Sequence, residues 1–531
     1  MKFGEETAAA LAVMRKQKKM ARDYLLEDAV SAGYQLTIAA EGLPAGQQDI
    51  IVALIRKEIP LDYPQIAVWW YSVLMGVKKD PSVFLEFITY IRANRNAFSL
   101  NTQYFLFYQL KSARFQFSVL HDPDNQRELW YYFKEVVEGF AEGVRMTPEW
   151  IPAEKRDDTL AVVITEQFLK IQHGPSKTAM DRCMALITRM RKRVILINTA
   201  EVLSQAGRIA YAGSVIGNYM PGLNKITKLD WKGITVPYHQ CSDTMPDQSE
   251  IEELLGIIRK LAPGYVIAIG GSGILANLVS RMLPVLTVGL CPSDLEFTMT
   301  QFQTLSRRLT SGEKNLLAEL GYDEDDVIES IFTSGLKAQA ERITRGELGV
   351  SDDKFLMIVV GARLDTEVTN EFMKMLDETV SGNMHVGFLG WFYKYEEWIK
   401  QYPRLRDYTS HFGFCADILS RLEVCDLYLN PLRQGGGTSC VEAMFMGLPV
   451  VTIGYGDVAV NAGDAFWVSD YAEMKAKIIR YQKDRMYYDE MSKQAKKRAA
   501  ILLDTETEFT NIIEIYAERM RQKEHKGDRG E

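Results

Sequence analysis

The chain has 531 residues, of which 47% are hydrophobic and 25% charged, and it carries a formal net charge of -8. This length predicts two to four domains, and this composition excludes a disordered chain. An acidic chain also lacks the basic surface that sequence-independent nucleic-acid binding requires, so we expect no nucleic-acid partner.

The N-terminal segment and the cysteines indicate a cellular compartment. The first twenty residues hold a short apolar run between acidic and basic residues, without the order of a secretory signal peptide. No run of about 20 apolar residues follows, so we expect no integral membrane segment. The six cysteines form no C-x-x-C pair, which favours reduced thiols over a disulfide frame or a zinc site. These features predict a cytoplasmic protein.

Residues 1–155 are predicted to form an all-α domain. Apolar residues recur at intervals of three and four, the helical period, in residues 47–59, 81–95 and 128–144. Clusters of aspartate and proline such as "HDPDN" separate these segments. Many aromatic residues lie here, and we interpret them as a core between helices rather than as a ligand platform.

Strands and helices alternate from residue 156 onward. A β-branched run at 159–169 precedes a helical segment and a second strand at 192–199, and the alternation continues to about residue 290. Such alternation indicates a parallel sheet with helices on both faces. Charged residues in 309–354 interrupt it, and we interpret the acidic stretch "YDEDDVIES" as a helix N-terminus rather than a metal-binding D-x-D.

The alternation restarts at "KFLMIVVGARL" and ends in amphipathic helices. The predicted fold class is therefore α/β with two Rossmann-like domains, at 156–345 and 346–510, between the helical domain and a C-terminal helix and tail at 511–531. The carboxyl ends of the strands of two such domains face each other across a cleft, where ligands bind.

One corner, residues 426–452, reads "DLYLNPLRQGGGTSCVEAMFMGLPVVT". Its glycine loop precedes a helix predicted to start near Thr438, and a helix N-terminus offers unpaired N–H groups and partial positive charge. Gly435, Gly436 and Gly437 put no side chain between an anion and that backbone, and Thr438 and Ser439 can cap the helix or donate to an oxygen. The corner predicts a phosphate site; the alternative is a tight turn that needs glycine only for its dihedral angles.

Two side chains are candidates for substrate chemistry. Glu442 lies one helical turn after Thr438, where its carboxylate can accept hydrogen bonds from two adjacent sugar hydroxyls. The alternative is an exposed glutamate that complements the helix dipole. His173 lies in "KIQHGPSKTAM", at the end of a strand, and can take a proton because its pKa is near neutrality. The alternatives are a hydrogen bond to a sugar hydroxyl and a partly buried histidine that satisfies a turn.

The corner resembles the donor-binding signature of GT-B glycosyltransferases, well over residues 350–510 and more loosely over 158–345. The resemblance implies a fold of two Rossmann-like domains facing a cleft, with a nucleotide-diphosphate sugar on the C-terminal domain. The glycine loop would then hold the diphosphate, Glu442 the ribose hydroxyls, and "HFGF" the base. Arg363 in "VVGARLDTEV" falls where such enzymes place a diphosphate-binding cation.

The resemblance assigns the following residues. The catalytic base is His173. The donor site comprises Arg363, Phe412, Gly413, Phe414, Asn430, Gln434, Gly435, Gly436, Gly437, Thr438, Ser439 and Glu442. Further candidates for the cleft are Gly174, Gly270, Gly271, Ser272, Lys394 and Arg433, although Gly270–Ser272 are at least equally consistent with a tight turn between strand and helix.

The sequence departs from the family pattern at two points. Many retaining members have a glutamate where Gln434 stands, and a glutamine cannot carry its charge, so an inverting reaction is favoured. The lysine that often follows the arginine is also missing, so phosphate charge would rest on Arg363, Arg433 or Lys394 and the helix end. A helical domain ahead of the GT-B halves resembles inverting cytoplasmic N-glycosyltransferases that modify bacterial adhesins.

The resemblance implies a bacterial, metal-independent hexosyltransferase without a prosthetic group. The preferred donor is a UDP-sugar, and the acceptor is a protein or peptide that the helical domain positions. The histidines show no metal-ligand spacing. A homo-oligomer or a partner subunit is compatible with this interpretation. The alternatives are a non-catalytic GT-B-like subunit or chaperone of a glycosyltransferase complex, and a nucleotide-sugar epimerase of the same fold.

Overall fold

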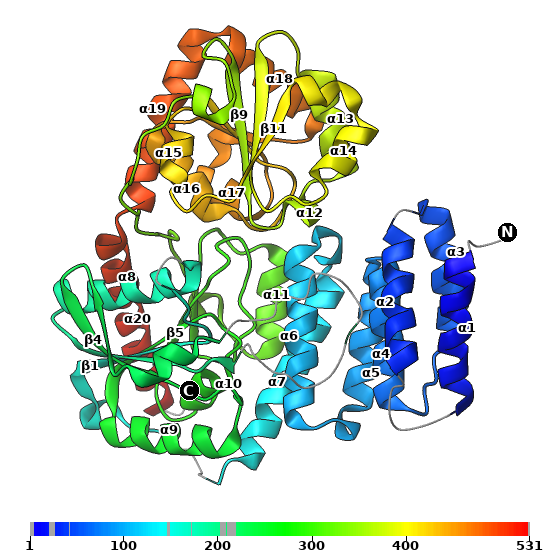
Figure 1. The fold of residues 1–531 in the computed structure, drawn as a ribbon. Coiled ribbons are helices and arrows are strands. Elements are labelled where there is room, and N and C mark those ends of the chain that lie inside the picture. The colour runs from blue at the N-terminus through cyan, green and yellow to red at the C-terminus, as the bar shows by residue number, and fades with distance from the viewer. Residues whose placement is uncertain are drawn as a thin grey trace.

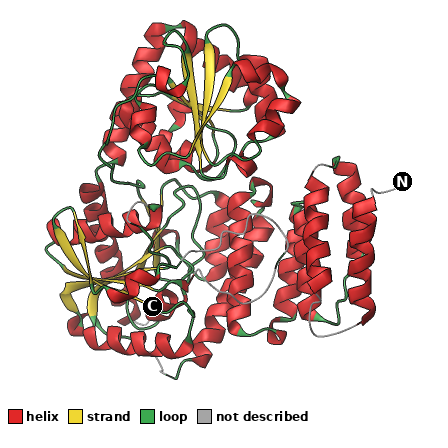
Figure 2. Ribbon diagram, in the orientation of Figure 1, coloured by secondary structure: helices red, strands yellow, loops and turns green. Residues whose placement is uncertain are grey.

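The computed structural model describes residues 5–20, 27–41, 43–145, 149–170, 173–201, 209 and 219–528. Figure 1 shows three parts: N-terminal helices, a sheet domain beside them, and a second sheet domain above both. In Figure 2 the strands of each sheet are flanked by helices. Among the described residues, no helix combines the length and the apolarity that crossing a bilayer requires.

The N-terminal part is helical, as predicted. Asp80 and Asp122 each precede a proline and accept backbone hydrogen bonds from the first helical turn, so an Asp-Pro pair starts both α5 and α7. The helices are α1 (Glu5–Met20), α2 (Glu27–Glu41), α3 (Ala45–Arg56), α4 (Pro64–Val77), α5 (Pro81–Ala93), α6 (Leu100–Gln116) and α7 (Pro123–Gly143).

The first sheet domain has eight strands in the order β3-β4-β2-β1-β5-β6-β7-β8. Among these strands β3 and β4 pair antiparallel and the other neighbours pair parallel. Its elements are β1 (Asp157–Thr165), α8 (Gly174–Thr188), β2 (Arg193–Asn198), β3 (Lys228–Trp231), β4 (Ile234–Gln240), α9 (Gln248–Leu261), β5 (Pro263–Ile269), α10 (Ile274–Val279), β6 (Val285–Val288), β7 (Phe302–Leu305), α11 (Ser311–Leu320) and β8 (Val327–Glu329).

One prediction about this domain holds only in part. The stretch "YDEDDVIES", predicted as a helix N-terminus, forms a single 3₁₀ turn, Glu324–Asp326, and then leads directly into strand β8. Val327 and Ile328 are buried in the sheet, so tertiary pairing with β7 overrides the local acidic pattern.

The second sheet domain has six parallel strands in the order β11-β10-β9-β12-β13-β14. Its elements are β9 (Phe355–Gly361), α12 (Leu364–Glu367), α13 (Asn370–Thr379), β10 (Met384–Gly390), α14 (Tyr395–Gln401), β11 (Thr409–Gly413), α15 (Ile418–Leu422), β12 (Leu427–Leu429), α16 (Gly437–Met446), β13 (Val450–Ile453), α17 (Gly456–Ala462), β14 (Trp467–Val468), α18 (Tyr471–Lys483) and α19 (Arg485–Leu502). The two Rossmann-like domains and the preceding helices confirm the predicted fold class.

The helical part and the first sheet domain share one hydrophobic core, whereas the second sheet domain has its own. The Trp130 indole of α7 donates to the Thr298 carbonyl oxygen at 3.2 Å, and Phe107 of α6 meets Phe297 edge to face. The last helix, α20 (Thr505–Asp528), returns to the first sheet domain, where Phe509 and Ile513 pack with residues of α8 (Figure 1). The helical part is therefore continuous with the core of the first sheet domain, which holds α6 at the cleft described below.

Candidate active site

A cavity of about 750 Å³ lies between the two sheet domains. It is lined by the carboxyl-terminal ends of strands and the loops and helix N-termini that follow them, as the fold predicts. Helix α6 supplies part of the wall with Tyr108, Lys111, Ser112, Arg114 and Phe115. All three parts of the chain therefore contribute to one cleft.

The cavity brings together most of the residues that the sequence placed in the phosphate, ribose and proton-transfer roles. These are His173, Gly174, Arg363, Phe414, Arg433, Gly435, Gly436, Gly437, Thr438, Ser439 and Glu442. They come from segments almost 270 positions apart in the chain, so the fold and not the local sequence assembles them.

The glycine corner presents an uncapped helix N-terminus to the cavity. Gly436 is the N-cap of α16, has φ +96°, and provides no side-chain hydrogen bond to the first turn. A Cβ atom on Gly436 would lie 2.6 Å from Nη2 of Arg433, so both the backbone conformation and the packing require glycine. The Ser439 hydroxyl is already bonded to the Gly436 carbonyl oxygen and to Tyr428. The free N–H groups of the first turn remain to receive an anion.

Two oppositely charged side chains face this corner without hydrogen bonds. Glu442 of α16 is 7% exposed and Lys177 of α8 is 6% exposed. Neither side chain makes a hydrogen bond or an ion pair with any residue in the described part of the chain. Burial raises the pKa of Glu442, an effect that Lys177 and Lys337 oppose, and burial lowers the pKa of Lys177. Buried charged groups without partners are costly, so both side chains are suited to a polar ligand.

Lys177 and Lys337 were not predicted. Lys177 lies one helical turn after His173 on the same face of α8, so helical periodicity could have indicated it once the histidine was chosen. Lys337 lies between the two sheet domains in a segment without regular secondary structure, where no sequence pattern distinguishes it.

His173 lies at the N-cap position of α8 and lines the cavity. Its Nδ1 atom is buried and has no hydrogen-bond partner among the described residues. Burial lowers the pKa of His173, so the imidazole is neutral at neutral pH. A neutral ring with a free nitrogen can accept a proton.

The two arginines near the glycine corner differ in how many of their guanidinium N–H donors are already hydrogen-bonded. Arg433 is buried, and its guanidinium donates to Asn430, Glu367, the Val360 carbonyl oxygen and the Tyr428 hydroxyl. Arg363 also binds Glu367, at 2.9 Å, but it is partly exposed and its Nε has no partner. Arg433 therefore holds the corner together, whereas Arg363 keeps donors for a ligand.

Several predicted residues do not reach the cavity. Ser272 is fully buried, and its N–H and hydroxyl donate to Glu166 at 2.6 and 2.9 Å. Gly270 has φ +86°, and Gly271 packs against Glu296, so Gly270–Ser272 form the tight turn that was the alternative interpretation. Lys394 is the N-cap residue of α14 and does not line the cleft.

Four residues assigned to donor binding do not line the cavity, and instead they hold neighbouring elements in place. Asn430 is buried and bonds to Arg433 and Thr452. Gln434 donates to the Ser293 hydroxyl of the first sheet domain at 2.6 Å, so it joins the two domains. Phe412 packs over Gly387 and Gly413 follows it in β11, and only Phe414 of this segment lines the cavity.

Asp457 of α17 also joins the domains and was not predicted. Its Oδ1 accepts a hydrogen bond from the Ser293 hydroxyl at 2.6 Å. Burial raises the pKa of Asp457 to about 7, partly offset by the bonds from Ser293. This carboxyl group lines the same cavity.

The comparisons agree with this geometry. Residues 341–498 match the model of the family described as "Glycosyl transferases group 1". A mutant of the O-GlcNAc transferase of Thermobaculum terrenum has a similar structure, with TM-score 0.57 and 12% identity, covering 98% of each chain. No curated protein matches the chain by sequence.

Two further solved structures have lower TM-scores and cover less of this chain. A glycosyltransferase from Rickettsia africae has TM-score 0.49 and 10% identity, covering 68% of this chain and 99% of its own. HepE of Anabaena, solved in complex with UDP and glucose, has TM-score 0.44 and 14% identity, covering 67% of this chain and 99% of its own. The chain has the GT-B fold, and its residues 341–498 match the glycosyl transferases group 1 family model.

Proposed function

We propose that the protein transfers a sugar from a nucleotide-diphosphate sugar, preferably a UDP-sugar, to a protein or peptide acceptor. The observation that carries this proposal is the pair Lys177 and Glu442, two buried charged groups without partners that face an uncapped helix N-terminus. A ligand with a diphosphate and a vicinal diol supplies the missing partner of each.

The donor would lie along α16. Its diphosphate accepts from the first-turn N–H groups of α16 and from Lys177, Lys337 and Arg363, and Glu442 accepts from the ribose hydroxyls. The acceptor nucleophile attacks the anomeric carbon while His173 takes its proton. The bond from that carbon to the diphosphate oxygen breaks, and the same cations stabilise the charge on the leaving group in place of a divalent metal. Attack opposite the leaving group inverts the anomeric centre.

The acceptor would enter beside α6. This helix forms a wall of the cavity, and Phe115 packs its ring against the Arg363 guanidinium, 5.0 Å from the ring centroid. A helical domain whose core is continuous with that of the first sheet domain can hold a large acceptor in a fixed position next to His173. The six free cysteines fit a cytoplasmic location.

Isothermal titration of the full chain with UDP, other nucleoside diphosphates and their sugars tests the donor. We expect one nucleoside diphosphate to bind, and Glu442→Ala to weaken binding by about 10- to 100-fold, the value of a lost hydrogen bond to a charged group. Glu397→Ala, which removes an exposed acid of α14, is the matched control. Absence of binding for every nucleoside diphosphate would favour a non-catalytic subunit, and turnover of donor without acceptor would favour an epimerase.

A further inference from the structure

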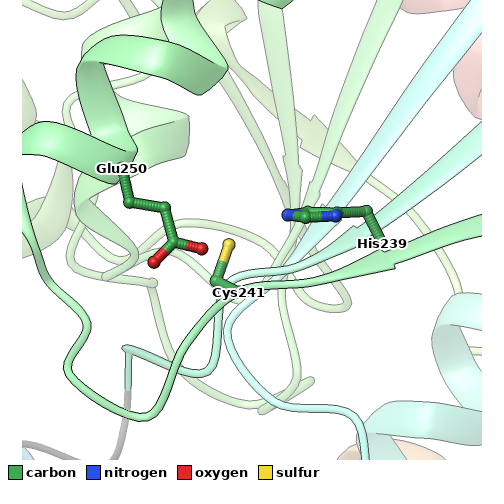
Figure 3. Close-up of side chains that lie close together, drawn as sticks. All are labelled: His239, Cys241 and Glu250. Carbon is green, nitrogen blue, oxygen red and sulfur yellow. The ribbon is translucent and has the colours of Figure 1, made fainter. Parts of the chain in front are cut away.

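A second cluster of ligand-type side chains lies outside the cleft, at the end of β4. The His239 ring nitrogens, the Cys241 sulfur and the Glu250 carboxylate offer atoms that all lie within 4.8 Å of one another. Figure 3 shows the thiol between the carboxylate and the imidazole. We propose that His239, Cys241 and Glu250 form a binding site for a divalent transition-metal ion of the zinc class.

The local structure explains why the three side chains converge. His239 and Cys241 are two positions apart on extended chain at the end of β4, so their side chains leave on the same side. Glu250 is the third residue of α9, where the Asp247 side chain accepts a hydrogen bond from its N–H at 2.9 Å. The sequence shows no metal-ligand spacing around His239, because the third side chain, Glu250, comes from the helix that follows the strand.

The ligand set and its size suit zinc. Thiolate, imidazole and carboxylate are the three ligand types that Zn²⁺ accepts, at roughly 2.0–2.3 Å in tetrahedral geometry, so two ligand atoms of one ion lie roughly 3.3–3.8 Å apart. The ligand atoms here lie within 4.8 Å of one another, so about 1 Å of closure brings them to coordination distance. His239 is exposed, so a rotation of its side chain closes the gap and leaves a coordination position for water.

Neighbouring groups orient these side chains as an outer shell does in metal sites. Ser242 donates from its N–H to Glu250 at 3.0 Å and from its hydroxyl at 2.6 Å, which fixes the carboxylate. The Tyr219 hydroxyl donates to the Cys241 carbonyl oxygen at 3.0 Å. The Cys241 thiol loses its proton to solvent when a divalent ion binds.

The ion would fasten the end of β4 to the start of α9. None of the three side chains lines the cleft between the domains, so the site is separate from the proposed transfer reaction. Because the ion would bind the folded chain, it would raise the thermal midpoint by mass action.

The test uses the full chain, first dialysed against a chelator and then titrated with Zn²⁺. We expect one bound zinc per chain by atomic absorption and a higher thermal midpoint. We expect Cys241→Ser and His239→Ala each to weaken binding by more than about tenfold, the loss that outer-shell changes alone produce. Cys425→Ser, which changes a buried thiol of the other sheet domain, should bind zinc as the parent does.

Two readouts separate lost ligands from lost folding. In chelator Cys241→Ser and His239→Ala should still unfold cooperatively, and only the parent should show a rise in midpoint when Zn²⁺ is added. Co²⁺ in place of Zn²⁺ should give a thiolate-to-metal absorption band that Cys241→Ser abolishes. If parent and Cys241→Ser hold the same amount of zinc, or the parent holds none, the cluster is a thiol–carboxylate hydrogen bond and the proposal is wrong.

Discussion

Lys177 of α8 and Glu442 of α16 face each other across the cleft, one from each Rossmann-like domain, and the charge of each favours the ionised form of the other. The two side chains form no ion pair with each other, and neither side chain makes a hydrogen bond in the described part of the chain. A ligand between them would gain from both charges, because water no longer competes strongly at either group.

Lys177→Gln should weaken the binding of a nucleoside diphosphate but not of the corresponding nucleoside, because the proposed ammonium contacts are with the phosphates and not with the nucleoside. The loss should be about tenfold or more, since hydrogen bonds between charged groups contribute about 1.5–3 kcal/mol. Titration calorimetry with UDP and uridine measures the difference. Lys400→Gln, which removes an exposed charge of α14, is the control. Equal losses for UDP and uridine would place Lys177 elsewhere in the donor site.

His173→Asn should slow transfer by about 10²–10⁴-fold and leave UDP affinity unchanged, because the base acts on the acceptor. Burial lowers the pKa of His173, so the imidazole protonates only below its ordinary value of about 6.5. The parent's kcat/KM should therefore be flat through neutrality and fall in acid. The residual activity of His173→Asn should lack that acid limb. A variant as fast as the parent would exclude His173 as the base.

Arg433→Met should lower stability more than it lowers donor affinity. The guanidinium is buried against Glu367, and removing one partner of such a pair costs about 3–5 kcal/mol of unfolding free energy. Urea denaturation of Arg433→Met, and of the double variant with Glu367→Leu, measures this cost, and the double variant should recover much of it. Unchanged stability together with lost UDP binding would show that Arg433 contacts the donor directly.

Asp457→Asn should stabilise the protein at alkaline pH. The pKa of the folded carboxyl is about 7 and that of an unfolded aspartate about 3.9, so the folded state retains a proton that the unfolded state has lost. The stabilising contribution is complete below pH 3.9 and is lost as pH rises to 7. At pH 8 the variant should exceed the parent by up to about 4 kcal/mol, and at pH 4 the two should agree. Parallel stability–pH curves would contradict the raised pKa.

Local patterns in the sequence predicted most helices and strands, but not which elements pack against one another. The helical periods at 47–59, 81–95 and 128–144 coincide with α3, α5 and α7, and the alternation from 156 onward produces both sheets. The acidic stretch before β8 predicted a helix and not a strand. An edge strand forms by pairing with its neighbour, here β7, and local composition does not reveal that pairing. Helix α20 gave no sign that it returns to the first sheet domain, since amphipathicity reports that a face is buried but not against what.

The sequence by itself determined the class of fold, the glycine corner and the position of Glu442 one turn beyond it. Each of these follows from dihedral angles and periodicities that act within a few residues. Only the tertiary structure decided that Arg433 is committed to Glu367, that Lys177, Lys337 and α6 complete the cleft, and that Glu250 meets His239 and Cys241. Those relationships depend on which elements pack together across long separations in the chain, and burial sets the charge and hydrogen bonding of each side chain only after that packing has formed.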